Sequence, residues 1–282
     1  MVVKTFILSD GTKLVYEDNG EGCPVLFIPG NCATRKTFTK YVDIFLKEGY
    51  RTISLDYRGV GDSIPSMTHP VTMELLGKDI AELIEGLDLN ELVLIGHSMG
   101  ANVIMEYIRD NGCDRLQAAI LMDGSCKTYT KEGDGWEYAN WCGQFTYEQA
   151  LELIKVAEQN FTGALRMIVA SMMPDASDEI VDIFLQKLLG DVEIQSMVEL
   201  YPTVFHGDLR DALSKFTVPT AYIFADDPKS IVHYKITDFY ESQVKGAYKS
   251  LGFKTADHTF IETMPEIVSE AIVNFLKNTQ HS

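Results

Sequence analysis

The sequence predicts an α/β protein in which a mostly parallel central sheet carries helices on both faces. Short apolar runs, long enough only for buried strands, alternate with longer segments whose apolar residues recur at helical spacing. From about residue 124 to about residue 213 this alternation stops and helical signals take over. We therefore expect residues 1–123 and 214–282 to form the core, with residues 124–213 inserted as a helical cap.

The first core segment contains a hairpin followed by strands and helices in alternation. Asp10-Gly11 is a turn signal between two short strands, so the hairpin is expected at one edge of the sheet. The expected strands are 5–8, 14–17, 25–28, 52–55, 92–95 and 118–122, and the expected helices are 38–46, 75–87 and 99–111.

The insertion and the last core segment carry clear helix starts. Thr146 and Gln149 form a capping box, as do Thr263 and Glu266. Further helical stripes are expected at 150–157, 180–189, 234–244 and 267–276, and strands at 218–224 and 248–253.

Gly96-His97-Ser98-Met99-Gly100 lies between a buried strand and a helix. In this context the G-x-S-x-G pattern predicts a nucleophile elbow, a tight turn that lifts the serine hydroxyl above the sheet edge. The two glycines leave room where a Cβ would meet a neighbouring element. The backbone N–H of Met99 then faces a developing oxyanion.

A serine nucleophile needs a base, usually a histidine that a carboxylate orients. Among six histidines, His258 is the best candidate, because it follows the last predicted strand and can reach the top of the sheet. The strand at 218–224 leads into Asp226 and Asp227, and the chain order Ser98, Asp227, His258 is the order expected of this type of hydrolase.

Composition excludes several classes of function. The formal net charge of −17 argues against binding to nucleic acid or to anionic membranes. The N-terminus has no long apolar segment, and no stretch reaches the length of a membrane span. The five cysteines are odd in number and lack a C-x-x-C pair, so we expect reduced thiols in a cytoplasmic protein and neither a disulfide frame nor a metal site.

Taken together, the motifs resemble those of the α/β-hydrolase superfamily, in its serine-nucleophile branch, over nearly the whole chain. The matching residues are Ile28-Pro29-Gly30-Asn31, Asp56-x-Arg58-Gly59-x-Gly61-x-Ser63, Gly96-His97-Ser98-Met99-Gly100, Val218-Pro219, Asp227-Pro228, His258 and Pro265-Glu266. The segment from Met122 to Pro174 is more loosely similar to bacterial arylesterases and cofactor-free haloperoxidase-like esterases.

The resemblance implies a role for each matching residue. Ser98 is the nucleophile, His258 the base and Asp227 the acid, and the N–H groups of Asn31 and Met99 form the oxyanion hole. Phe224 replaces the glycine that usually precedes the acid, so Asp226 remains an alternative to Asp227 as the acid. Asp123, at the end of the preceding strand, also stays open, because some family members carry the acid there.

The expected function is hydrolysis of a small, largely apolar carboxylic ester or lactone without a metal or organic cofactor. A thioesterase or carbon–carbon hydrolase would use the same triad, and a ligand-binding sensor could use the same fold. Trp136, Trp141 and Phe145 of the insertion are candidate pocket residues, although most such side chains form the core of a cap. The expected partner is a small-molecule substrate, with a homodimer as a further possibility.

Overall fold

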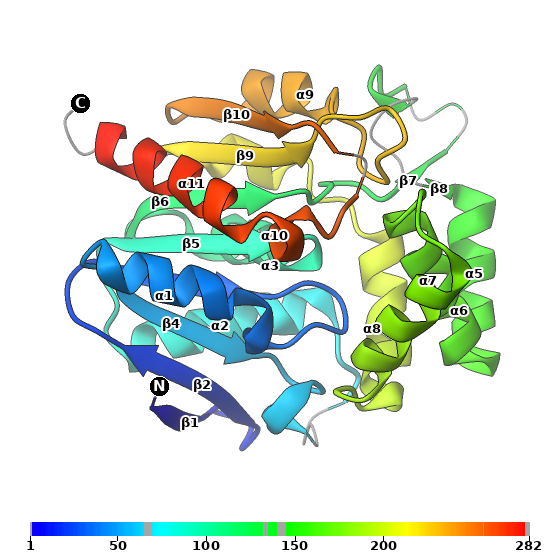
Figure 1. Ribbon diagram of the computed structural model, residues 1–282, viewed down its shortest axis with the longest axis horizontal. Helices are drawn as coiled ribbons and strands as arrows, with labels where there is room; N and C mark the ends of the chain where they lie inside the picture. The colour runs from blue at the N-terminus through cyan, green and yellow to red at the C-terminus, as the bar shows by residue number, and fades with distance from the viewer. Residues whose placement is uncertain are drawn as a thin grey trace.

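The computed structural model describes residues 2–64, 69–131, 133, 135–139, 145–255 and 257–279. Within them, an eight-stranded sheet has the strand order β1-β2-β4-β3-β5-β6-β9-β10 (Figure 1). β2 pairs antiparallel with β1 and β4, and all other neighbours in the sheet are parallel. The predicted class is confirmed, with the hairpin at one edge. The strands are β1 Val3–Ile7, β2 Lys13–Asn19, β3 Pro24–Ile28, β4 Arg51–Asp56, β5 Leu92–His97, β6 Leu116–Met122, β9 Thr220–Ala225 and β10 Tyr248–Phe253.

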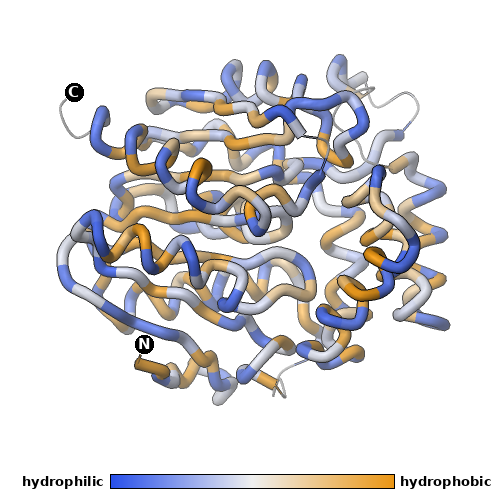
Figure 2. The backbone as a smooth tube through the Cα atoms, in the orientation of Figure 1, coloured by the Kyte–Doolittle hydropathy of each residue, from blue (hydrophilic) through white to orange (hydrophobic). Residues whose placement is uncertain are grey.

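The central strands are buried on both faces. Side chains alternate along a strand, so Val25 and Phe27 of β3 enter one core cluster while Leu26 and Ile28 enter the other. A strand between two helical layers must be apolar at every position, which explains the continuous apolar runs in the sequence. Figure 2 shows this hydrophobicity along the inner strands and on the inward-facing turns of the helices.

Two pairs of helices cover the sheet (Figure 1). α1 (Thr39–Lys47) and α11 (Pro265–Thr279) pack on one face, and α2 (Met73–Gly86) and α3 (Met99–Asn111) pack on the other. The shorter helical elements are α9 Ile236–Gln243, α10 Phe260–Thr263 and the 3₁₀ helices Arg35–Phe38, Gly61–Ser63 and Ala212–Lys215. No helix in the described part of the chain has both the length and the apolarity needed to cross a membrane.

Between β6 and β9 the chain leaves the sheet and forms an insertion beyond the carboxyl ends of the parallel strands (Figure 1). The predicted capping box of Thr146 and Gln149 is present. Helical signals alone missed two strands, which pair parallel to each other and, at two residues each, are too short to show periodicity. The elements are β7 Tyr129–Thr130, β8 Phe145–Thr146, α5 Tyr147–Gln159, α6 Phe161–Met172, α7 Asp178–Leu189 and α8 Ile194–His206.

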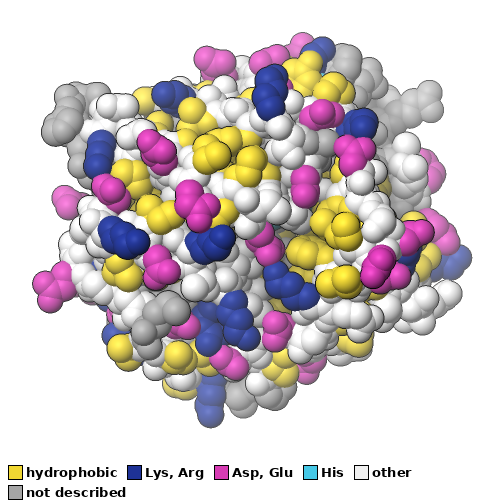
Figure 3. All heavy atoms as spheres, in the orientation of Figure 1, with side chains coloured by type: hydrophobic (Ala, Val, Ile, Leu, Met, Phe, Trp, Pro, Cys, Tyr) yellow, Lys and Arg dark blue, Asp and Glu magenta, His cyan; other side chains and the backbone are white. Residues whose placement is uncertain are grey.

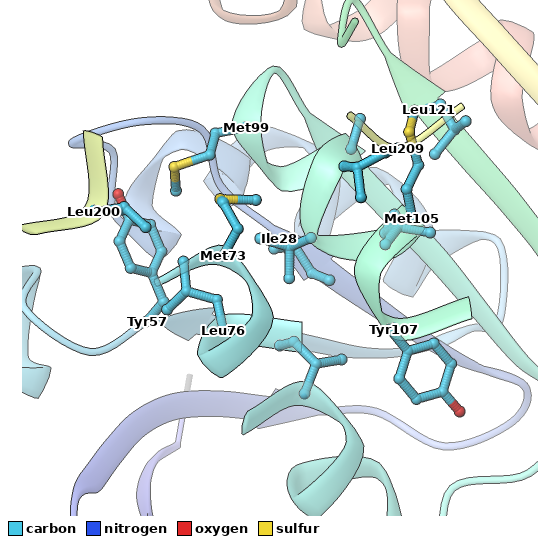
Figure 4. Packing of buried hydrophobic residues seen from close by; sticks show 14 of the residues in the cluster. Ile28, Tyr57, Met73, Leu76, Met99, Met105, Tyr107, Leu121, Leu200 and Leu209 are labelled. Atoms are coloured by element: carbon cyan, nitrogen blue, oxygen red, sulfur yellow. The ribbon is translucent and has the colours of Figure 1, made fainter. Parts of the chain in front are cut away.

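One hydrophobic cluster joins the insertion to the sheet. Figure 4 shows Met73 and Leu76 of α2 near Ile28 of β3, with Leu200 of α8 beside them. All four are buried and belong to the same cluster as the cores of α5 and α6. The insertion is therefore packed on the rest of the protein, at the edge where the strands deliver their functional residues.

Candidate active site

Ser98 forms the predicted turn between β5 and α3. Its backbone has φ 53° and ψ −120°, a strained conformation for a residue with a side chain. The turn is possible because glycine stands on both sides: a Cβ on Gly96 would clash with the Gly100 carbonyl, and one on Gly100 with the Ile28 carbonyl of β3. The close approach of strand and helix brings Ser98 to the wall of a cavity.

His258 lies in the loop after β10 and lines the same cavity. Its Nδ1 lies 2.6 Å from Oδ2 of Asp123, the residue that follows β6. Both side chains are buried, at 3% and 0% exposure. Burial raises the pKa of the Asp123 carboxyl, and the hydrogen bond to His258 opposes that shift. Because a carboxylate accepts, Nδ1 carries the proton and Nε2 is left as the basic nitrogen.

Asp123 therefore replaces Asp227 as the carboxylate that contacts His258, and the assignment of Asp227 is wrong. β9 ends at Ala225, and Asp227 begins the next turn, where its carboxylate accepts from the Lys229 N–H at 2.8 Å. Asp226 pairs with Lys254. Asp123 was one of the alternatives left open by the sequence, and its signal was its place directly after a buried strand.

The two predicted oxyanion donors, the N–H groups of Asn31 and Met99, belong to residues that line the cavity. Within the described residues neither N–H has a hydrogen-bond acceptor. Met99 is the first residue of α3, where the helix dipole favours a negative charge. This arrangement leaves two backbone donors free for an oxyanion.

A tyrosine network supports the turn that carries Asn31. Tyr57 Oη donates to the Gly30 carbonyl at 3.2 Å and accepts from the Cys32 N–H at 2.9 Å. Cys32 has a φ of 57°, so the turn is strained where the tyrosine holds it. Asn31 Nδ2 donates to Tyr201 Oη of α8 at 3.2 Å, which connects the turn to the insertion. Sequence motifs did not indicate either tyrosine.

His97 contacts both the backbone and the ring of His258. Its Nε2 lies 3.1 Å from the His258 carbonyl oxygen, and the two rings are 4.7 Å apart. Burial lowers the pKa of His97 well below its ordinary value, and the neighbouring His258 lowers it further. His97 is thus neutral and donates from Nε2, because a carbonyl only accepts.

The cavity has a volume of about 80 Å³ and is mainly apolar. The insertion supplies Ile168 and Met172 from α6, Phe184 and Leu188 from α7, and Val204 and Phe205 from α8. The Met172 carbonyl also accepts from the His258 N–H at 3.0 Å, so α6 holds the loop of the base.

The predicted pocket residues lie elsewhere. Trp136 is absent from the described cavity lining and packs on Tyr138 and Phe239, with ring centroids 6.3 and 5.2 Å away. Phe145 is also absent from that lining and packs edge-on against Phe205, which does line the cavity, with ring centroids 5.7 Å apart. Neither ring lines this cavity, so both predictions are wrong: the two rings are partly buried and pack on other aromatic side chains, Trp136 on Phe239 of α9 and Phe145 on Phe205 of α8. Trp141 lies outside the described residues.

No group of three or more histidine, cysteine or acidic side chains in the described part of the chain is placed to hold a metal ion. The structure brings together at this cavity a serine at a strained turn, a histidine bonded to a buried carboxylate, and the backbone N–H groups of Asn31 and Met99.

Comparisons with known proteins bear on the fold. The family model described as alpha/beta hydrolase fold matches residues 24–149. The non-heme chloroperoxidase CPO-A1 of Kitasatospora aureofaciens is 33% identical over 113 residues, 40% of this chain and 41% of that protein. A non-heme chloroperoxidase of Streptomyces lividans is 26% identical over 284 residues, 97% of this chain and 99% of that protein.

Among solved structures, an esterase from Exiguobacterium antarcticum superposes with a TM-score of 0.84 at 24% identity, covering 98% of this chain and 100% of the esterase. The fold and the elbow thus define an α/β-hydrolase-fold protein. The chain has the α/β-hydrolase fold, and it is similar to non-heme chloroperoxidases in sequence and to an esterase in structure.

Proposed function

We propose that this chain is a serine hydrolase that cleaves a small, largely apolar carboxylic ester or lactone through an acyl-enzyme on Ser98. The observation that carries the proposal is the buried bond between His258 and Asp123, beside a serine in an elbow conformation. A buried carboxylate on Nδ1 fixes the tautomer whose Nε2 can take a proton.

The reaction proceeds in two halves. Nε2 of His258 takes the proton of Ser98 Oγ as the oxygen attacks the ester carbonyl, and the N–H groups of Asn31 and Met99 bind the oxyanion. The imidazolium, stabilised by Asp123, gives the proton to the departing alcohol. Water then attacks the acyl-enzyme by the same route and releases the carboxylic acid. The helices of the insertion act as a cap that keeps an apolar acyl group on the serine.

Steady-state turnover on a panel of short esters, lactones and thioesters tests the proposal. We expect ester or lactone turnover at ~1–10³ s⁻¹, lost by about 10⁴-fold in Ser98→Ala. A preference for thioesters would favour the thioesterase alternative. Deacylation slower than about one per minute on every substrate, against that usual range, would replace the enzyme with a sensor.

The acid has its own matched pair of variants. Asp123→Asn removes the charge beside His258 and is expected to lower kcat by about 10⁴-fold. Asp227→Asn, in a partly exposed turn where an amide oxygen can also accept from the Lys229 N–H, is expected to change kcat by less than about twofold. The reverse ranking would refute the assignment of Asp123.

A further inference from the structure

A second hollow adjoins the catalytic cavity. It is larger, about 370 Å³, and four of its lining residues also line the catalytic cavity. The four shared residues are Ala33, Thr37, Leu188 and Glu262. The two hollows therefore meet along one wall, where the turn after β3, helix α7 of the insertion and helix α10 of the core come together.

The two hollows differ in chemistry. The inner cavity is lined from the insertion by the aliphatic, aromatic and methionine side chains of α6, α7 and α8. The outer groove is also lined by apolar residues, but it adds charged side chains that the inner cavity lacks, which are Lys36, Lys40, Lys187 and Asp191. Figure 3 shows the face where α7 and α10 meet, with basic, acidic and hydrophobic side chains exposed between the core and the insertion.

One ion pair stands on the shared wall. Lys187 Nζ of α7 lies 2.6 Å from Glu262 Oε2 of α10, and the pair connects the insertion to the core. Glu262 is four residues after His258 and belongs to both hollows, whereas Lys187 lines only the outer one. The Glu262 side chain is 28% exposed and the Lys187 side chain 56% exposed. An ion pair exposed to this degree contributes little to stability and separates readily.

We propose that the outer groove binds the alcohol portion of the substrate and that the Lys187–Glu262 pair is the boundary that this portion must pass. The inference rests on the proposed function. An acyl group that stays on Ser98 needs the apolar inner cavity, while the alcohol must leave and water must enter on the side that opens outward. The substrate class is therefore an ester of an apolar acyl group with a polar, hydrogen-bonding alcohol.

Three butyrate esters test this. One is methyl butyrate, one carries a triethylene glycol monomethyl ether chain, and one carries an n-decyl chain of about equal length. We expect the wild type to have a kcat/KM for the glycol ester at least about tenfold above that for the decyl ester, because a charged groove disfavours an alkyl chain. A preference for the decyl ester would overturn the assignment of the groove.

The boundary is tested by Lys187→Ala and Glu262→Ala. Each is expected to raise the ratio of kcat/KM for the glycol ester over methyl butyrate by about threefold or more, since the passage widens. Lys229→Ala is the matched control: it breaks the 2.8 Å pair with Asp175, which also joins the core to the insertion but lies outside both hollows, and should leave the ratio unchanged.

The outcomes separate the two proposals. An unchanged ratio in both boundary variants, or an equal change in Lys229→Ala, overturns the role of the ion pair while ester turnover by the wild type still supports the hydrolase. Absence of turnover on all three esters in the wild type overturns the substrate class inferred here, whereas absence of turnover on the whole panel of esters, lactones and thioesters overturns the proposed function itself. Lys187 is more than half exposed, so its variant keeps the test decisive even if Glu262→Ala fails to fold.

Discussion

His97 should make the protein less stable as the pH falls, and two substitutions measure this. Its pKa is held well below the ordinary 6.5 by burial, so the folded protein does not take up a proton there. The unfolded chain does so below pH 6.5, and the free energy of unfolding then falls with pH. The stability that the neutral, buried His97 provides is lost progressively as the pH falls below 6.5, until the folded protein protonates His97 as well.

The magnitude follows from linkage for one group. While the folded protein stays unprotonated at His97, the free energy of unfolding falls by up to about 1.4 kcal/mol for each pH unit below 6.5. His97→Gln keeps an N–H donor for the His258 carbonyl but does not titrate. The difference in unfolding free energy between wild type and variant should therefore shift in favour of the variant as the pH falls below 6.5, by up to about 1.4 kcal/mol per pH unit.

Urea unfolding at a series of pH values measures the shift, and His97→Phe serves as the second variant. Phenylalanine does not titrate either, but it leaves the His258 carbonyl without a hydrogen-bond donor. The unfolding free energy of His97→Phe should therefore follow the same pH dependence as that of His97→Gln and be lower by about 1–3 kcal/mol at each pH. If wild type and His97→Gln keep a constant difference from pH 6.5 to about pH 4.5, His97 is not a buried neutral group and the reasoning fails.

Three further predictions follow from the geometry. Tyr57→Phe frees the turn after β3 and should lower kcat by about tenfold with little change in KM, measured by steady-state kinetics on short esters; an unchanged kcat would contradict the role of the network. Phe205→Ala should change the relative kcat/KM among acyl chain lengths, whereas Trp136→Ala should mainly lower the melting temperature, by several degrees; the opposite result would return Trp136 to the pocket. Gly100→Ala meets backbone and should destabilise the fold by more than about 3 kcal/mol, whereas Gly112→Ala, at φ 70° in open space, should cost about 1 kcal/mol in denaturant unfolding; equal costs would refute the packing argument.

The sequence predicted the core well because the signals there are local. A buried strand between two helical layers is an unbroken apolar run, and the elbow at Ser98 needs glycine at fixed offsets, so both can be identified without knowing what lies opposite. His258 was found by its place after the last strand. The short strands β7 and β8 and the contacts of Tyr57 depend on partners distant in the chain, and no local pattern records them.

The pocket was predicted poorly for a related reason. An aromatic ring at helical spacing faces the inside of a helical group, but the sequence does not say whether that inside is core or cavity. Trp136 faces Phe239 of α9, which lies about a hundred residues later in the chain. The side chains that line the cavity, such as Phe184 and Leu188, occupy the same apolar stripe of α7 that a packed core would need.

An acid after β6 can take the place of one after β9 because both strands end at the same edge of the sheet, beside His258. They are neighbours, with Met122 paired to Ile223, so the residue after β6 reaches the histidine from one strand nearer to Ser98. The end of β9 still takes part, since the Ala225 N–H lies 3.4 Å from Oδ1 of Asp123. Each oxygen of the Asp123 carboxylate thus accepts from one neighbour, Oδ2 from His258 and Oδ1 from the Ala225 N–H. β9 contributes a backbone donor instead of an acid. Chain order alone cannot distinguish these arrangements, because Ser98, Asp123, His258 and Ser98, Asp227, His258 run in the same order.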